Sequence, residues 1–285
     1  MHTFTVKEYE AGLPLLQFLQ EQIPAAGLGY VRQLIKKGRI SSAGQVCTEN
    51  TLLTCGQTIQ VRDSARLREL CAEVSVSAAA LNILYESAQM LVVDKPAGLA
   101  VHTGSGHEGD NLTARVQAYL QGKPFQVSPI HRLDAGTSGP VLFGKGKKSC
   151  AALGALFMRH EVEKVYVALV RGNMQGSGVL AHTLSAKGKR KPCFTGFVTR
   201  KRCAKASLVE LTLVTGRQHQ IRRQLAEIGH PIVGDSRYGG DDLPGLRHPF
   251  LHCCSIAFND PFSGAPLKIE SALPHPLQEV AAIYF

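Results

Sequence analysis

One short segment of the chain concentrates polar groups that could do chemistry. Residues 131–139 read His-Arg-Leu-Asp-Ala-Gly-Thr-Ser-Gly, which brings together a carboxylate, a guanidinium and two hydroxyls. Glycine and hydroxyl side chains favour turns, and loops on a rigid scaffold are where catalytic groups concentrate. Asp134 is therefore a candidate catalytic carboxylate at a strand edge. Taken alone, the residues slightly favour a plainer interpretation, in which Asp134 caps a turn or pairs with Arg132.

A second polar stretch lies further along the chain. Residues 216–225 read Gly-Arg-Gln-His-Gln-Ile-Arg-Arg-Gln-Leu and predict a helix over 218–228. One face of this helix would carry Gln218, Ile221, Arg222 and Leu225. The Arg222 guanidinium could pair bidentately with either a carboxylate or a phosphate. The glycine-rich stretch 229–239 follows at once, so we expect it in the same region.

Alternating strands and helices must position these groups. Strands are predicted at 91–93, 140–143, 164–170 and 207–214, and helices at 111–120, with Asn111 as the N-cap, and at 149–159. Together they indicate a mixed α/β domain long enough for a sizeable core.

Five stretches of the chain, in order and spacing, resemble the RluA family of pseudouridine synthases. They are LVVDKPAGLAVH (91–102), HRLDAGTSG (131–139), KVYVALVRG (164–172), GRQHQIRRQL with GHPIVGDSRYG (216–225 and 229–239), and LHCCSIAF with DPFSG (251–258 and 260–264). The resemblance runs from about residue 82 to about residue 275. Departures from the family pattern are small: Pro140 replaces an aliphatic residue, Gln218 a threonine and Cys253 an alanine.

This resemblance implies a fold and a reaction. The fold would be the α+β pseudouridine synthase fold, a mixed and mainly antiparallel sheet flanked by helices. The reaction would be isomerisation of specific uridines in structured RNA: the N1–C1′ bond breaks, the uracil turns over, and C5 joins C1′. A single strong-motif carboxylate fits an isomerase, since glycoside hydrolysis uses two.

The resemblance also assigns roles to five residues. Asp134 would be the essential carboxylate, acting either on C1′ or on the 2′ proton. Arg222 would pair with Asp134 and keep it ionised, and Tyr166 would stack on the uracil. Arg132 would occupy the gap left by the flipped nucleotide, and His131 would support the same loop and contact RNA.

Residues 1–62 form a separate unit in this interpretation. Two helices, from Pro14 and over 31–37, precede short strands at 39–40 and 58–61. The basic residues of the second helix and its exit are Arg32, Lys36, Lys37 and Arg39. This pattern resembles the alpha-L RNA-binding domain over about residues 7–62, although Gly-Gln-Val at 44–46 lacks an expected basic residue. We predict domains at 1–62 and 82–285, joined by a linker at 63–81; an ordinary solvated helix face is the alternative interpretation of the basic residues.

Charge agrees with a nucleic-acid partner. Lysine and arginine number 32 and aspartate and glutamate 22, which gives a net charge of +10. The acid-free region 187–205 contributes Lys187, Lys189, Arg190, Lys191, Arg200, Lys201, Arg202 and Lys205. We expect a phosphate-facing hairpin or loop there, with a solvated loop as the alternative.

Other features narrow the class of protein. The sequence has no apolar run of membrane-spanning length and no secretory signal, and its eight cysteines lack a Cys-x-x-Cys pair. We expect a cytoplasmic monomer with reduced thiols, no metal and no cofactor, acting on large-subunit ribosomal RNA or, alternatively, transfer RNA. A non-catalytic RNA-binding or ribosome-assembly protein would not need Asp134, Tyr166 and Arg222. A metal-dependent hydrolase built from His131, Asp134, His230 and Asp235 lacks ligand spacing.

Overall fold

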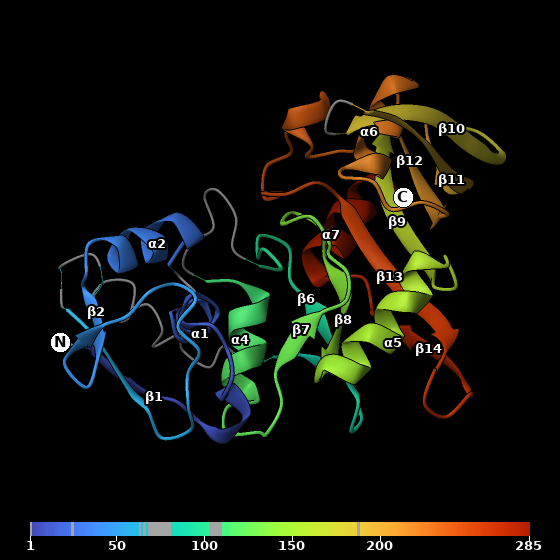
Figure 1. Ribbon diagram of the computed structural model, residues 1–285. Helices are drawn as coiled ribbons and strands as arrows, with labels where there is room; N and C mark the ends of the chain where they lie inside the picture. The colour runs from blue at the N-terminus through green and yellow to red at the C-terminus, as the bar shows by residue number, and fades with distance from the viewer. Residues whose placement is uncertain are drawn as a thin grey trace. The chain divides into compact units, whose positions relative to one another are not determined.

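The computed structural model of this chain describes residues 2–23, 26–62, 64, 67, 81–102, 110–186 and 189–285, without the side chains of residue 9 and of 184–190 (Figure 1). The chain divides into two compact units. One comprises Met1–Ala80 with His102–Gln126, and the other Leu81–Val101 with Val127–Phe285. Each unit is described by itself below.

The N-terminal unit is built on a four-stranded antiparallel sheet in the order β1-β4-β2-β3. Its elements are β1 (His2–Thr5), η1 (Glu8–Glu10), α1 (Leu15–Gln22), α2 (Leu28–Lys36), β2 (Ile40–Ser42), β3 (Gln45–Val46), β4 (Thr58–Val61) and α4 (Leu112–Tyr119). Pro14 is the N-cap of α1 rather than its first residue. Strand β1 was not predicted, because it depends on pairing with β4 far along the chain.

Helix α2 has the two faces that its sequence predicts. Val31, Leu34 and Ile35 are buried in the core of the unit. The basic residues Arg32, Lys36, Lys37 and Arg39 are exposed. Arg32 makes an ion pair with Glu49, with 3.3 Å between Nε and Oε2. The exposed face is compatible with a phosphate contact, which stays a prediction.

The boundary between the units differs from the one predicted at residues 62 and 82. Residues 102–126 cluster with the N-terminal unit, where Gln126 donates a hydrogen bond of 2.7 Å to Glu21. Leu67, in the predicted linker, is fully buried in the core of that unit. Sequence periodicity locates a helix but not its packing partner, so it could not assign α4. Most of the predicted linker lies outside the described residues.

The second unit holds two antiparallel sheets, as expected for the predicted α+β class. A four-stranded sheet runs β5-β6-β8-β7, and a six-stranded sheet runs β10-β11-β12-β9-β13-β14. The strands are β5 (Ile83–Glu86), β6 (Met90–Lys95), β7 (Val127–Pro129), β8 (Gly139–Lys145), β9 (Glu163–Arg171), β10 (Ser177–Ala186), β11 (Lys189–Arg202), β12 (Ala206–Leu213), β13 (Leu251–Asn259) and β14 (Pro266–Glu270). The helical segments are α5 (Lys147–Met158), α6 (Gln220–Glu227), η2 (Ser236–Tyr238) and α7 (His275–Tyr284).

The two sheets meet at the end of the polar segment 131–139. Ser138 forms a parallel bridge with His252 of β13, and its hydroxyl lies 2.9 Å from His252 Nδ1. Gly139 has φ +125°, and a Cβ there would lie 2.3 Å from the Cys253 carbonyl oxygen. Only glycine fits this close approach. The motif glycine therefore lets β8 pass against β13 and anchors the loop that precedes it.

Local predictions of secondary structure hold for most of this unit. Helix α6 is an exception, because it begins at Gln220 rather than residue 218 and His219 takes a left-handed backbone with φ +52°. The basic region 189–202 is one strand of a long hairpin with β10. Among the described helices, none combines the length and apolar character needed to cross a membrane.

Candidate active site

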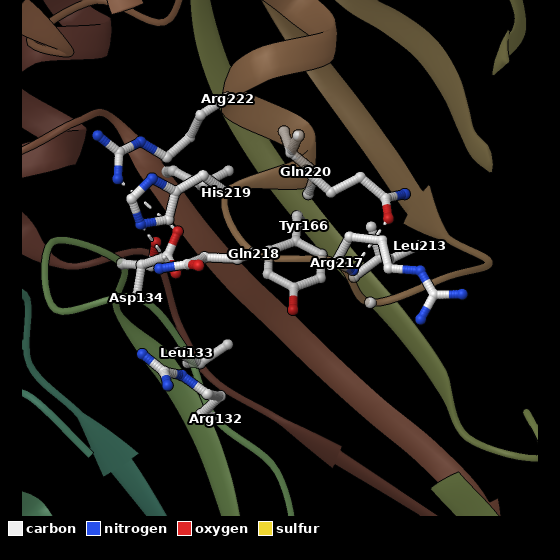
Figure 2. A pocket seen from close by; sticks show the side chains of 14 residues that line it. Arg132, Leu133, Asp134, Tyr166, Leu213, Arg217, Gln218, His219, Gln220 and Arg222 are labelled. Atoms are coloured by element: carbon white, nitrogen blue, oxygen red, sulfur yellow. Dashed lines mark hydrogen bonds and ion pairs between the residues drawn. The ribbon is translucent and has the colours of Figure 1, made fainter. Parts of the chain in front are cut away.

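One pocket of the second unit collects the residues that the sequence singled out (Figure 2). It encloses about 190 Å³. Its walls come from the loop residues 132–134 and 137, from Tyr166 on β9, from Leu213 and residues 216–222, and from Leu251 on β13. Asp134, Tyr166 and Arg222, which lie far apart in the sequence, therefore face a single cavity.

Asp134 stands in a tight turn and lines this pocket. The Thr137 amide donates to the Asp134 carbonyl oxygen at 3.0 Å and closes the turn. The side chain remains 18% exposed. Figure 2 shows Arg222 and His219 converging on it: Arg222 Nη1 lies 3.7 Å from Oδ2, and His219 Nε2 lies 3.7 Å from Oδ1. Asp134 is thus an accessible carboxylate with a basic group beside each oxygen.

The bidentate partner of Arg222 is the carboxylate of Asp235 rather than that of Asp134. Its Nε and Nη2 each donate a hydrogen bond of 2.7 Å to Asp235, which is 1% exposed. Burial acts to lower the pKa of Arg222, but Asp235 and Asp134 more than offset it and raise that pKa. The pair of Arg222 with Asp134 that the resemblance implies is present as a 3.7 Å contact, while the bidentate hydrogen bonds go to Asp235. Sequence placed both carboxylates in motifs, yet only the fold of the 229–239 loop brings Asp235 to the guanidinium fork.

Tyr166 presents a neutral phenol to the pocket. It lies on β9 opposite Leu211 of β12 and Cys253 of β13, and only 6% of it is exposed. Burial, with the neighbouring Cys253 and Asp134, raises the pKa of Tyr166 well above its ordinary value. A flat, uncharged ring in a pocket wall is suited to stacking on a nucleobase.

Arg132 and His131, which lie two and three positions before Asp134, have different surroundings. Arg132 is exposed at the pocket rim, where a solvent-facing guanidinium is available to RNA. His131 instead accepts a hydrogen bond from the Leu142 amide at 3.1 Å and stacks on Phe157 at 4.9 Å. Burial, together with Lys164, lowers the pKa of His131 to about 3. His131 therefore supports the loop through these contacts, and its role as an RNA contact stays a prediction.

The basic hairpin is less free than its sequence indicates. Lys191 is exposed, but the side chains of Lys189 and Arg190 lie outside the described residues. Arg200 is engaged by Glu210 in a bidentate pair at 3.1 and 2.7 Å. Strand pairing brings this acid next to Arg200 although the stretch 187–205 contains none. The hairpin's role in binding phosphate stays a prediction.

Lys95 is a site residue that sequence reasoning did not single out. It is fully buried, and its Nζ donates to the carbonyl oxygens of Pro96, Leu99 and Ala135 at 2.8, 2.7 and 3.0 Å. Burial lowers the pKa of Lys95 to about 7, against the opposing effects of Asp134 and Asp94. Because Ala135 follows Asp134 directly, the Lys95 hydrogen bond restrains the backbone next to Asp134. A lysine inside an apolar stretch was the available signal.

His219 and Tyr238 were also missed as a pair. His219 Nδ1 lies 2.8 Å from the Tyr238 hydroxyl, and the Arg222 guanidinium carbon lies 5.0 Å from the Tyr238 ring centroid. Burial lowers the pKa of His219, helped by Arg222 and opposed by Asp134. The left-handed turn before α6 carries His219 toward Asp134.

Within the described residues, no group of three or more His, Cys, Asp or Glu side chains could hold a metal ion. Two members of the hypothetical hydrolase set are engaged elsewhere. His230 Nδ1 lies 2.8 Å from the Arg171 carbonyl oxygen, and Asp235 is taken by Arg222. These contacts engage two of the three residues that this set would place beside Asp134.

Comparison with known proteins points to one family. The family model described as RNA pseudouridylate synthase matches residues 89–227. Ribosomal large subunit pseudouridine synthase C of Haemophilus influenzae is 30% identical over 302 residues, covering 97% of this chain and 92% of that protein. The synthase C of Escherichia coli K12 is 30% identical over 94% of this chain and 92% of its own length. Synthase D of Xanthomonas campestris is 28% identical, over 96% and 90% respectively.

Solved structures support the fold. Human RNA Pseudouridylate Synthase Domain Containing 4 superposes with a TM-score of 0.62 at 23% identity, covering 74% of this chain and 96% of that one. Human RNA Pseudouridylate Synthase Domain Containing 1 gives 0.55 at 22% identity, covering 73% and 95%. The predicted α+β fold class is confirmed.

Proposed function

Because this chain belongs to the RluA family of pseudouridine synthases, and is therefore an RNA isomerase, we propose that its substrate is large-subunit ribosomal RNA. The relatives named as ribosomal large-subunit synthases, matched over nearly their whole length, support this choice of RNA. The net charge of +10 suits a polyanionic substrate. Such a substrate would be met in the cytoplasm, which is where we infer that the enzyme works.

Asp134 is the carboxylate that acts on the ribose in this proposal. One contrast within the site supports this role. The Asp134 side chain is partly exposed and lines the pocket, whereas Asp235 is buried and accepts hydrogen bonds from Arg222 on both oxygens. Hydrolysis of a glycosidic bond needs two working carboxylates. One free carboxylate serves an isomerisation, in which no water has to be activated. Attack at C1′ and removal of the 2′ proton both use this same group.

In this proposal, Tyr166 and Arg132 contact the RNA around the extruded uridine. A uridine in folded RNA must leave its stack, which costs a few kcal/mol. The neutral Tyr166 ring supplies a surface on which the extruded uracil stacks while it turns over. Arg132, exposed at the rim, fills the space that the uridine leaves.

Pseudouridine mapping of total RNA tests this function. In a strain lacking the gene, we expect one or a few sites of large-subunit ribosomal RNA to lose pseudouridine. The wild-type chain should restore them, and Asp134→Asn should not. Loss of sites in transfer RNA instead would leave the reaction intact and overturn the proposed substrate. A strain that loses no site would contradict the function itself.

We also propose that the basic face of the N-terminal unit holds RNA. Replacing Lys36, Lys37 and Arg39 by glutamine should make the slope of log K against log salt shallower by about 2 to 3, since each phosphate contact contributes about 0.7 in single-stranded and about 0.9 in duplex nucleic acid. The rate at saturating enzyme should not change. An unchanged slope would show that this face does not bind phosphate.

A further inference from the structure

The second oxygen of Asp134 has its own neighbour. Arg222 faces Oδ2, and His219 Nε2 faces Oδ1 at 3.7 Å. His219 is half-buried and is the N-cap residue of α6. Its backbone is left-handed, and its ring lines the pocket. Catalytic contacts are often long before substrate binds and shorten in the complex. A histidine held here can restrain the rotation of the carboxylate.

The surroundings of His219 determine where its ring carries a proton. An ionised Asp134 offers only acceptor lone pairs, so a nitrogen facing it must bear hydrogen. In a neutral imidazole the other nitrogen is then an acceptor. The Tyr238 hydroxyl, 2.8 Å from Nδ1, is placed to donate to that acceptor. Asp134 requires hydrogen on Nε2, and Tyr238, whose hydroxyl can donate or accept, stabilises that tautomer by donating to Nδ1.

A neutral ring suits this position. Arg222 and Arg237 disfavour a further positive charge there, whereas Asp134 and Asp235 favour it; burial has the largest effect, and the net result is a lowered pKa for His219. A neutral N–H can orient Asp134 without neutralising it. A second cation beside Asp134 would weaken it as a nucleophile or base.

We propose that His219 is a positioning residue for Asp134, with its tautomer stabilised by Tyr238, so that Nε2–H holds Oδ1 while Arg222 holds Oδ2. The proposal rests on the proposed role of Asp134 as the working carboxylate. Tyr238 and Asp235, three residues apart in one loop, then hold the two side chains that orient Asp134. This gives the glycine-rich loop 229–239 a function in the chemical step.

Two substitutions at His219 separate positioning from structure. Asparagine tolerates the left-handed backbone, but its amide reaches only the place of Nδ1 and leaves Oδ1 without a donor. Glutamine can place an N–H where Nε2 stands. With unmodified large-subunit ribosomal RNA transcript at saturating enzyme, His219→Asn should lower the single-turnover rate about tenfold or more. His219→Gln should recover most of it, and both should bind RNA within about twofold of wild type, because neither removes a phosphate contact.

Tyr238→Phe is the matched variant on the other side of the ring. It keeps the aromatic face under Arg222 and removes only the hydroxyl. In protein labelled with ¹⁵N-histidine, the His219 resonances, assigned by their loss in His219→Asn, should show hydrogen on Nε2. Tyr238→Phe should raise the share of the other tautomer and slow the reaction several-fold. This measurement needs no substrate, so it does not depend on the proposed RNA target.

Several results would overturn the proposal. They are a wild-type rate in His219→Asn, equal losses in His219→Asn and His219→Gln, a normal rate with weakened RNA binding, or a wild-type His219 with hydrogen on Nδ1. An inactive wild-type enzyme on this transcript would count against the proposed substrate, while the tautomer would still test the pairing with Tyr238.

Discussion

The loops 131–139 and 229–239 each bring one aspartate to Arg222, but the two aspartates contact the guanidinium in different ways. Asp235 takes the guanidinium fork at 2.7 Å on both oxygens and is 1% exposed. Asp134 meets the remaining nitrogen at 3.7 Å and stays 18% exposed. A bidentate pair fixes geometry at the expense of reactivity, because both oxygens are occupied. The contrast supports our proposal that Asp134 is the working carboxylate, with Asp235 as the residue that holds Arg222 in place.

The largest expected effect is the loss of isomerisation rate on substitution of Asp134. Asp134→Asn removes the reactive carboxylate, and we expect the isomerisation rate to fall by about 10³-fold or more. RNA binding should stay within a few-fold of wild type, because removing a negative charge does not weaken contact with a polyanion. Single-turnover kinetics and filter binding measure the two quantities. A variant that kept near-wild-type turnover would remove Asp134 from the reaction.

Substitution of Asp235 should mainly lower the free energy of unfolding. Asp235→Asn leaves Arg222 buried without its counter-charge, and breaking such a pair costs about 3 kcal/mol of unfolding free energy or more. Asp134→Asn, at a partly exposed site, should change stability much less. Denaturant unfolding of both variants provides the comparison. Equal losses in the two variants would erase the distinction between the loops.

Arg222→Lys tests the guanidinium that the loops share. Lysine keeps the charge but lacks the planar fork, so it cannot hold Asp235 bidentately and face Asp134 at once. We expect the rate at saturating enzyme to fall about tenfold with little change in RNA affinity. If the rate stayed normal and binding weakened, Arg222 would be a phosphate contact instead.

Lys95 anchors the Asp134 loop and should give the protein a pH dependence of stability. Burial lowers the folded-state pKa of Lys95 to about 7, below its ordinary 10.5. Between these values the unfolded chain binds more protons, so this residue should make the unfolding free energy rise with pH from 7 to 10.5. The unfolding free energy of the wild type minus that of Lys95→Met should therefore increase with pH over that range. A difference independent of pH would show that Lys95 keeps its proton.

Local patterns predicted much of the fold. Helix α4 follows its Asn111 cap, whose side chain accepts from the Ala114 amide at 3.0 Å, as expected. The buried stripe of α2 follows from its apolar spacing. These features depend on neighbours within a few residues. The pairing of β1 with β4 and the packing of α4 depend on distant contacts, which spacing does not encode.

The site was predictable as a set of residues but not as a set of contacts. Family motifs placed Asp134, Tyr166 and Arg222, and the fold brings all three to one pocket. Which aspartate takes the Arg222 fork depends on the path of the 229–239 loop. The inward turn of His219 needs a left-handed backbone, which a helical pattern conceals.

The rates of Asp134→Asn and Asp235→Asn, measured side by side, test the division between the two loops most directly. Both should be assayed by single-turnover kinetics on the same RNA, at a temperature where both variants are folded. We predict that Asp235→Asn retains measurable isomerisation, at least about tenfold faster than Asp134→Asn. An Asp134→Asn enzyme that is active while Asp235→Asn is inactive would contradict the assignment and make Asp235 the working carboxylate.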